Sequence, residues 1–113
     1  MRLTDLEPTF LRRKPDDADG HEINQYVDLI DDADGVAFLC PTCFVTNGGP
    51  VGTHQILCWR PRVPPEIAPR PGRWEMLGSC YDDLTLFAGS SSVLLTSGCR
   101  AHFFVRAGQI IPC

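Results

Sequence analysis

The chain has 113 residues, 43% of them hydrophobic, and its 14 Asp and Glu outnumber its 10 Lys and Arg for a net charge of −4. This length predicts one domain spanning 1–113, and no apolar run is long enough to cross a bilayer. A net negative chain has no overall field that attracts phosphate backbones, so neither a nucleic acid nor a membrane is an expected partner.

The first 15 residues carry apolar side chains among charges and end in the basic run Arg12-Arg13-Lys14. We expect 1–15 to be a short N-terminal arm that packs its apolar residues on the body of the domain, rather than a nucleic-acid-binding tail. Charges and a proline interrupt the first eight positions, which is unlike a signal peptide. We therefore expect a cytoplasmic protein.

A pentapeptide, Asp-Asp-Ala-Asp-Gly, occurs twice, at 16–20 and at 31–35, and both copies are predicted to be polar turns. They resemble the start of a calcium loop, but neither copy has the glutamate that such a loop needs at its twelfth position. Between the copies, apolar residues recur at i, i+3, i+4 and i+7. This period predicts a short amphipathic helix with Ile23, Tyr26, Val27 and Ile30 on one face.

The middle of the chain reads as a hairpin followed by a long loop. Residues 36–39 are predicted to be a buried strand, 48–52 a turn, and 53–59 the returning strand. The segment 60–73 holds five prolines and four arginines, and prolines on this scale exclude a helix or a central strand. This Pro/Arg-rich loop is either solvated or a recognition arm for an acidic partner.

The last third alternates apolar and polar residues in short runs separated by glycines, which predicts strands. With the single predicted helix, the fold class is α+β and mostly β, with a small antiparallel sheet. The predicted strands lie at 74–77, 84–87, 93–95, 102–105 and 110–111.

Two pairs of metal-binding residues have the same two-residue spacing. Cys40 and Cys43 form the first pair, and Cys99 and His102 form the second, far downstream. Three sulfurs and one imidazole fill a tetrahedral Zn²⁺ site of the structural kind. We therefore predict a zinc-ribbon-like site that joins two distant loops, and in so small a domain the ion would be a determinant of the fold.

The six cysteines also admit a disulfide framework or a redox motif. Cys58, Cys80 and Cys113 follow no pairing pattern, and nothing in the sequence indicates export to an oxidising compartment. A thioredoxin-like motif would follow a strand and open a helix, whereas 44–50 is expected to run into a turn. Zinc binding is therefore the favoured interpretation.

Five stretches stand out together in their order along the chain: 33–44, 52–54, Trp74, 82–86 and 98–105. They resemble a family of small phage and bacterial proteins that is classed as a domain of unknown function. Some members carry an ammonia monooxygenase label, and bacterial relatives lie beside genes for ubiquitin-like conjugation. The resemblance implies a zinc-bearing domain in the bacterial cytoplasm and, through the gene neighbourhood, a peptidase that acts on ubiquitin-like protein tails.

A serine peptidase needs a hydroxyl nucleophile, an imidazole base and a carboxylate that orients the base. Outside the predicted metal site, the candidates for these roles are Ser92, His54 and Asp83. Ser90 and Ser91 compete with Ser92, because this segment carries extra residues relative to the family and lacks the proline that precedes its serine. For the carboxylate, Asp82 is an equal alternative to Asp83.

Structural roles compete with the catalytic ones. His54 is equally a strand residue or a spare metal ligand, and a serine triplet beside glycine is typical of a turn. The alternative to a peptidase is a non-catalytic zinc-ribbon module that binds a protein partner. Such a module would present the Pro/Arg-rich loop together with Trp59 or Trp74.

Overall fold

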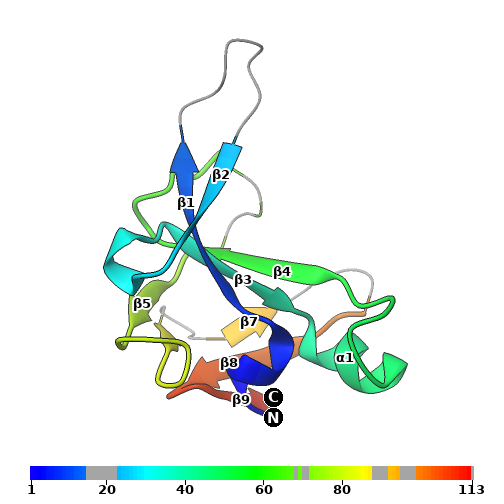
Figure 1. The fold of residues 1–113 in the computed structure, drawn as a ribbon. Helices are drawn as coiled ribbons and strands as arrows, with labels where there is room; N and C mark the ends of the chain where they lie inside the picture. The colour runs from blue at the N-terminus through cyan, green and yellow to red at the C-terminus, as the bar shows by residue number, and fades with distance from the viewer. Residues whose placement is uncertain (15–22, 68, 70–71, 88–91, 95–98, 113) are drawn as a thin grey trace.

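The computed structural model describes residues 1–14, 23–67, 69, 72–87, 92–94 and 99–112, in which the strands form three antiparallel sheets of order β2-β1-β3-β4, β5-β6 and β7-β8-β9 (Figure 1). The described residues contain one α-helix, α1, and two short 3₁₀ helices. The predicted class, α+β and mostly β, is confirmed. The strands are β1 Thr9–Lys14, β2 Ile23–Val27, β3 Gly35–Leu39, β4 Gln55–Trp59, β5 Glu75–Leu77, β6 Thr85–Phe87, β7 Ser92–Leu94, β8 His102–Arg106 and β9 Gln109–Pro112, and the helices are η1 Leu3–Leu6, η2 Ile30–Asp32 and α1 Pro41–Asn47.

The hydrophobic core joins the four-stranded sheet to the C-terminal strands. Phe38 of β3 meets Phe103 of β8 edge to face, with ring centroids 6.0 Å apart. Phe10 of β1 stacks on Tyr81 at 4.2 Å, and the backbone N–H of Phe10 donates to the Tyr81 hydroxyl oxygen. These four rings are large apolar surfaces, whose burial is the main stabilising contribution in a domain of this size.

The N-terminal segment is part of the sheet rather than an appended arm. Its apolar residues Leu3, Leu6, Phe10 and Leu11 are buried, but residues 9–14 form the strand β1, which pairs with β2 on one side and β3 on the other. Apolar and polar side chains alternate poorly here, so no period-2 pattern marks this segment as a strand. Pairing on both edges makes β1 a central strand.

The predicted amphipathic helix is wrong. Residues 23–27 form β2, which pairs with β1 in a register that places Val27 opposite Phe10, and only 30–32 form a turn of 3₁₀ helix. The proposed apolar face is also split, because Tyr26 is 76% exposed while Ile30 is buried. Pairing with the open edge of β1 outweighs a helical period that spans barely two turns.

The first cysteine pair opens a helix, contrary to the predicted turn. Cys40 is the N-cap residue of α1, Pro41 occupies its first turn, and Gly48 ends it with a φ of 69°. These are the usual places of proline and glycine at helix ends. The motif therefore follows a strand and begins a helix.

In the described part of the chain, no helix has the length and apolar character needed to span a membrane.

The Pro/Arg-rich loop is held by its own arginines. The Arg73 guanidinium donates to five backbone carbonyls, Arg62 forms an ion pair with Asp34 at 2.8 Å, and Arg60 donates to the carbonyl of Ile30. Three of the four arginines thus serve the chain itself, and Arg70 lies outside the described residues. The five acceptors of Arg73 are the carbonyls of Val63, Pro64, Ile67, Pro69 and Gly72.

Candidate metal centre

The register of β3 against β4 brings Cys40 next to His54. Leu39 pairs with Gln55 at the end of the ladder, and the next pair is closed by the Cys40 N–H, which donates to the His54 carbonyl oxygen at 2.9 Å. Residues directly opposite each other in an antiparallel pair project side chains to the same face. The hairpin therefore places a thiol and an imidazole side by side.

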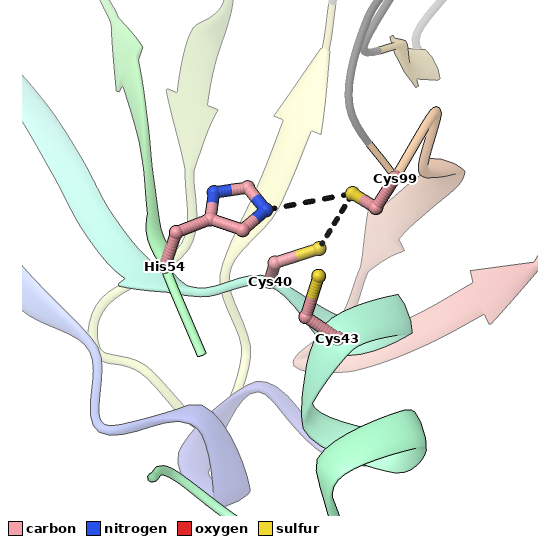
Figure 2. Close-up of side chains that lie close together, drawn as sticks. All are labelled: Cys40, Cys43, His54 and Cys99. Carbon is pink, nitrogen blue, oxygen red and sulfur yellow. Dashed lines mark hydrogen bonds between the residues drawn. The ribbon is translucent and has the colours of Figure 1, made fainter. Parts of the chain in front are cut away.

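The helix α1 adds a second thiol. Cys43 is the third residue of α1, and the Phe44 N–H donates to the Cys40 carbonyl oxygen at 2.9 Å. This first turn folds Cys43 back toward the end of β3 (Figure 2). Cys40 is fully buried and Cys43 is half-buried.

The third thiol comes from the segment just before β8, a strand of the sheet β7-β8-β9. Cys99 precedes β8, and the chain turns at Arg100, whose φ of 53° is left-handed. Ala101 then enters the core with 2% of its surface exposed. This turn directs the half-buried Cys99 side chain toward Cys40 and His54 (Figure 2).

Four potential ligand atoms converge as a result. Cys40, Cys43, His54 and Cys99 contribute three Sγ atoms and one ring nitrogen, all within 4.8 Å of one another. The Cys40 and Cys99 sulfurs are 3.5 Å apart, and His54 Nε2 is 3.4 Å from the Cys99 sulfur. A tetrahedral zinc site has S···S edges of about 3.8 Å and S···N edges of about 3.5 Å, from bond lengths of about 2.3 and 2.0 Å. The cluster has the size and donor set of such a site.

The pKa values of the three thiols are shifted in different directions. Burial raises the pKa of Cys40 to about 11 and also raises the pKa of Cys43. The hydrogen bond with His54 lowers the pKa of Cys99 to about 7. Without a cation, the site thus favours one thiolate and opposes two more, because burial penalises the charged form and like charges this close repel. A divalent cation removes that repulsion and allows all three sulfurs to ionise.

His102, the predicted fourth ligand, lies outside this cluster, and His54 takes the corresponding place. His102 begins β8, where its backbone pairs with Leu94. Its neighbours Ala101 and Phe103 are buried, whereas His102 is exposed. Alternation along the strand therefore directs His102 to the opposite face. A CxxH spacing brings both ligands to one ion only if one turn contains both residues. Here the turn contains Cys99 but ends before His102, which already belongs to the strand β8.

The predicted catalytic residues are found in separate settings. His54 faces the thiols, as described above. Asp83 accepts hydrogen bonds from the Ser79 N–H and hydroxyl and from the Cys80 N–H, at 2.8 to 2.9 Å. The bonds from Cys80 and Ser79 lower the pKa of Asp83 to about 2. Asp83 thus shapes the turn between β5 and β6.

Asp82 and Ser92 also lie in structural settings, and Ser90 and Ser91 are not among the described residues. Asp82 forms an exposed ion pair with Arg2 at 3.3 Å. Ser92 begins β7, with its backbone opposite Phe104. Ser90 and Ser91 fall outside the described residues. The Ser-His-Asp arrangement therefore stays a prediction from the resemblance.

The cysteines outside the cluster are dispersed. Cys58 of β4 is buried, and burial raises its pKa to about 12. Cys80 is exposed in the β5–β6 turn, and Cys113 lies outside the described residues. An inert thiol such as Cys58 is a small apolar core residue.

One feature of the sequence could have indicated His54. The sequence predicts the hairpin formed by 36–39 and 53–59, and in any such hairpin the residues just beyond the paired ends face each other. Cys40 follows the first strand and His54 precedes the paired part of the second. Without the register, however, two or three neighbouring positions compete for this place.

Comparisons of the chain with profiles of known protein families, with curated protein sequences and with solved structures gave no match.

Proposed function

We propose that the protein is a small structural-zinc protein in which Cys40, Cys43, His54 and Cys99 bind one Zn²⁺ ion. The observation that carries this proposal is the convergence of three sulfurs and an imidazole nitrogen within 4.8 Å. Three thiolates and one imidazole complete the tetrahedron, so no coordination position is left for water or substrate. The ion would cross-link the β3–α1–β4 hairpin to the segment before β8.

Metal analysis of the purified chain tests the proposal. We expect one zinc per chain, and removal of the ion with a strong chelator should lower the melting temperature. Replacement of zinc by Co²⁺ should give the visible absorption of a tetrahedral ion with thiolate ligands. A metal-free protein that melts at the same temperature with and without added zinc would refute the proposal.

The serine-peptidase prediction competes for the same imidazole. An Nε2 atom bound to zinc has no lone pair left to take a proton from a serine hydroxyl, so His54 cannot be ligand and general base at once. The geometry supports the ligand role, because Nε2 lies 3.4 Å from the Cys99 sulfur. This favours the non-catalytic module, although Trp59 is buried and cannot be presented to a partner.

A fluorophosphonate probe separates the two functions. A non-catalytic module should stay unlabelled in its zinc-loaded form. Labelling of Ser92 in the parent, and its loss in Ser92→Ala with unchanged zinc content, would establish an activated serine of the hydrolase kind instead and would require a base other than zinc-bound His54.

A further inference from the structure

The two sulfurs that meet in the cluster come from different sheets. Cys40 ends β3 and Cys99 precedes β8, yet their Sγ atoms are 3.5 Å apart (Figure 2). A disulfide bond has an S–S length of about 2.05 Å, so an approach of about 1.5 Å would join them. The contact is therefore close to a covalent cross-link at the position where the metal would act.

Cys99 and Cys40 differ in their access to solvent and in how firmly their backbones are held. Cys99 is half-buried and so can be reached from solvent, whereas Cys40 is fully buried behind it. The backbone of Cys40 is held on both sides, by its N–H bond to His54 and by the Phe44 N–H bond to its carbonyl. An accessible thiol beside a fixed, shielded one is the arrangement of a peroxide-reactive cysteine and a resolving cysteine.

We propose that the metal centre is a peroxide-sensitive switch, in which oxidation joins Cys40 to Cys99 and releases Zn²⁺. This inference rests on the zinc site proposed above. The disulfide would hold together the same two segments that the ion held. The modification site is thus the Cys40–Cys99 pair, and the co-reactant is a hydroperoxide such as H₂O₂.

The reaction balances in two steps. The Cys99 thiolate attacks one oxygen of H₂O₂, the O–O bond breaks, and the leaving hydroxide takes a proton to give water and a Cys99 sulfenic acid. The Cys40 thiolate then attacks the Cys99 sulfur, the S–O bond breaks, and the second hydroxide leaves as water after taking a proton. Two electrons pass from the sulfurs to the peroxide. Only Cys43 and His54 remain as ligands, so Zn²⁺ leaves.

Cys43 provides the competing product. It is also half-buried and shares the first turn of α1 with Cys40, and a strand–CxxC–helix segment is a familiar setting for a disulfide. A Cys40–Cys43 bond would close a local ring and leave Cys99 untied from β3. The Cys40–Cys99 bond would instead preserve the long-range link, so the two products predict different stabilities.

Oxidation of the zinc-loaded full-length chain tests the switch. Zinc release would be followed with a chromogenic chelator during H₂O₂ addition, and remaining thiols would be blocked with iodoacetamide. Chymotrypsin, which cleaves after Phe44 and Trp59, separates Cys40 and Cys43 from Cys58 for mass mapping. We expect one zinc released per disulfide, the bond mapped to Cys40 and Cys99, and rebinding of zinc after reduction.

Three variants sharpen the mapping. Cys80→Ser removes the exposed thiol outside the cluster and should leave the yield of cross-link unchanged. Cys43→Ser should weaken zinc binding yet still form the Cys40–Cys99 bond. Cys99→Ser should lose the cross-link, and the oxidised parent should melt at a higher temperature than the reduced, chelated parent.

The outcomes separate the switch from the zinc site. A zinc-loaded protein whose oxidation gives the Cys40–Cys43 bond, or sulfinic acids without any disulfide, overturns the switch and leaves the zinc site standing. Zinc retained at peroxide concentrations that oxidise Cys80 also overturns it. A chain that binds no zinc before oxidant is added refutes the zinc proposal itself.

Discussion

Replacement of His54 by glutamine decides which histidine completes the metal centre. His102→Gln is the matched control, because both histidines are exposed and neither replacement opens the core. A structural zinc site contributes about 10 to 16 kcal/mol of apparent binding energy. Shared evenly among four ligands, this is about 3 kcal/mol each, or roughly a 100-fold loss of affinity for one ligand.

The same loss can be read as stability. At a zinc concentration that saturates both the parent and the variant, a 100-fold weaker site lowers the free energy of unfolding by about 2.7 kcal/mol. In a domain of about this length, that corresponds to a melting temperature lower by roughly 10 °C. His102→Gln should stay within about 0.5 kcal/mol of the parent, as expected for an exposed residue without a special role.

Competition against a chelator of known affinity gives the zinc dissociation constants, and Co²⁺ spectra give the donor set. His54→Gln should bind zinc about 100-fold more weakly and lose the spectrum of a three-sulfur, one-nitrogen site. Parent-like affinity in His54→Gln together with weak binding in His102→Gln would refute the geometry of Figure 2 and restore the ligand set expected from the sequence.

Three further predictions concern the scaffold around the centre. Asp83→Asn should lower the melting temperature at neutral pH without changing the zinc content. Because the folded pKa of Asp83, about 2, lies below its unfolded value, the deficit relative to the parent should persist above about pH 4 and disappear as the pH falls toward 2. Asp82→Asn is the control and should show little of this deficit. Arg73→Lys cannot reach five carbonyls and should cost about 1 to 3 kcal/mol in chemical denaturation, with zinc affinity unchanged. Gly108→Ala should lower the free energy of unfolding by about 2 kcal/mol or more, because the new Cβ would sit at a left-handed φ of 74° and against the Asp82 carbonyl. Gly48→Ala has only the unfavourable φ and should lower it by about 1 kcal/mol. Equal losses at the two glycines would contradict this packing.

Much of the β-structure could be predicted from the sequence because short apolar runs between glycines need no long-range information. The strands β5, β6, β8 and β9 lie within two residues of their predicted positions. The failures lie where pairing partners decide. Residues 23–27 have a helical period, and only the open edge of β1 makes them a strand. The segment 9–14 looks like an appendage until both of its neighbours are known.

The helix at the first cysteine pair shows a different limit. Pro41 and Gly48 are helix-boundary residues, but both are also turn residues, and the sequence favours the turn when glycines follow at 48 and 49. A turn at this place would disfavour a redox role for the cysteine pair. Since Cys40 and Cys43 follow a strand and open a helix, the local structure permits thiol–disulfide chemistry, and the cluster supplies a third thiol for it.

Local spacing could identify the thiol ligands because the two residues between Cys40 and Cys43 fix their separation within one turn. It could not identify the histidine, since that choice depends on the β3–β4 register and on where β8 begins. Three of the four ligand atoms therefore come from a single hairpin, and Cys99 alone comes from the other sheet. Of the four bonds to the ion, the one to Cys99 links the hairpin to the segment before β8 and so closes a long loop of the chain. Loop closure of this kind stabilises by restricting the unfolded chain, and the same reasoning explains why a Cys40–Cys99 disulfide could replace the ion while a bond within the hairpin could not.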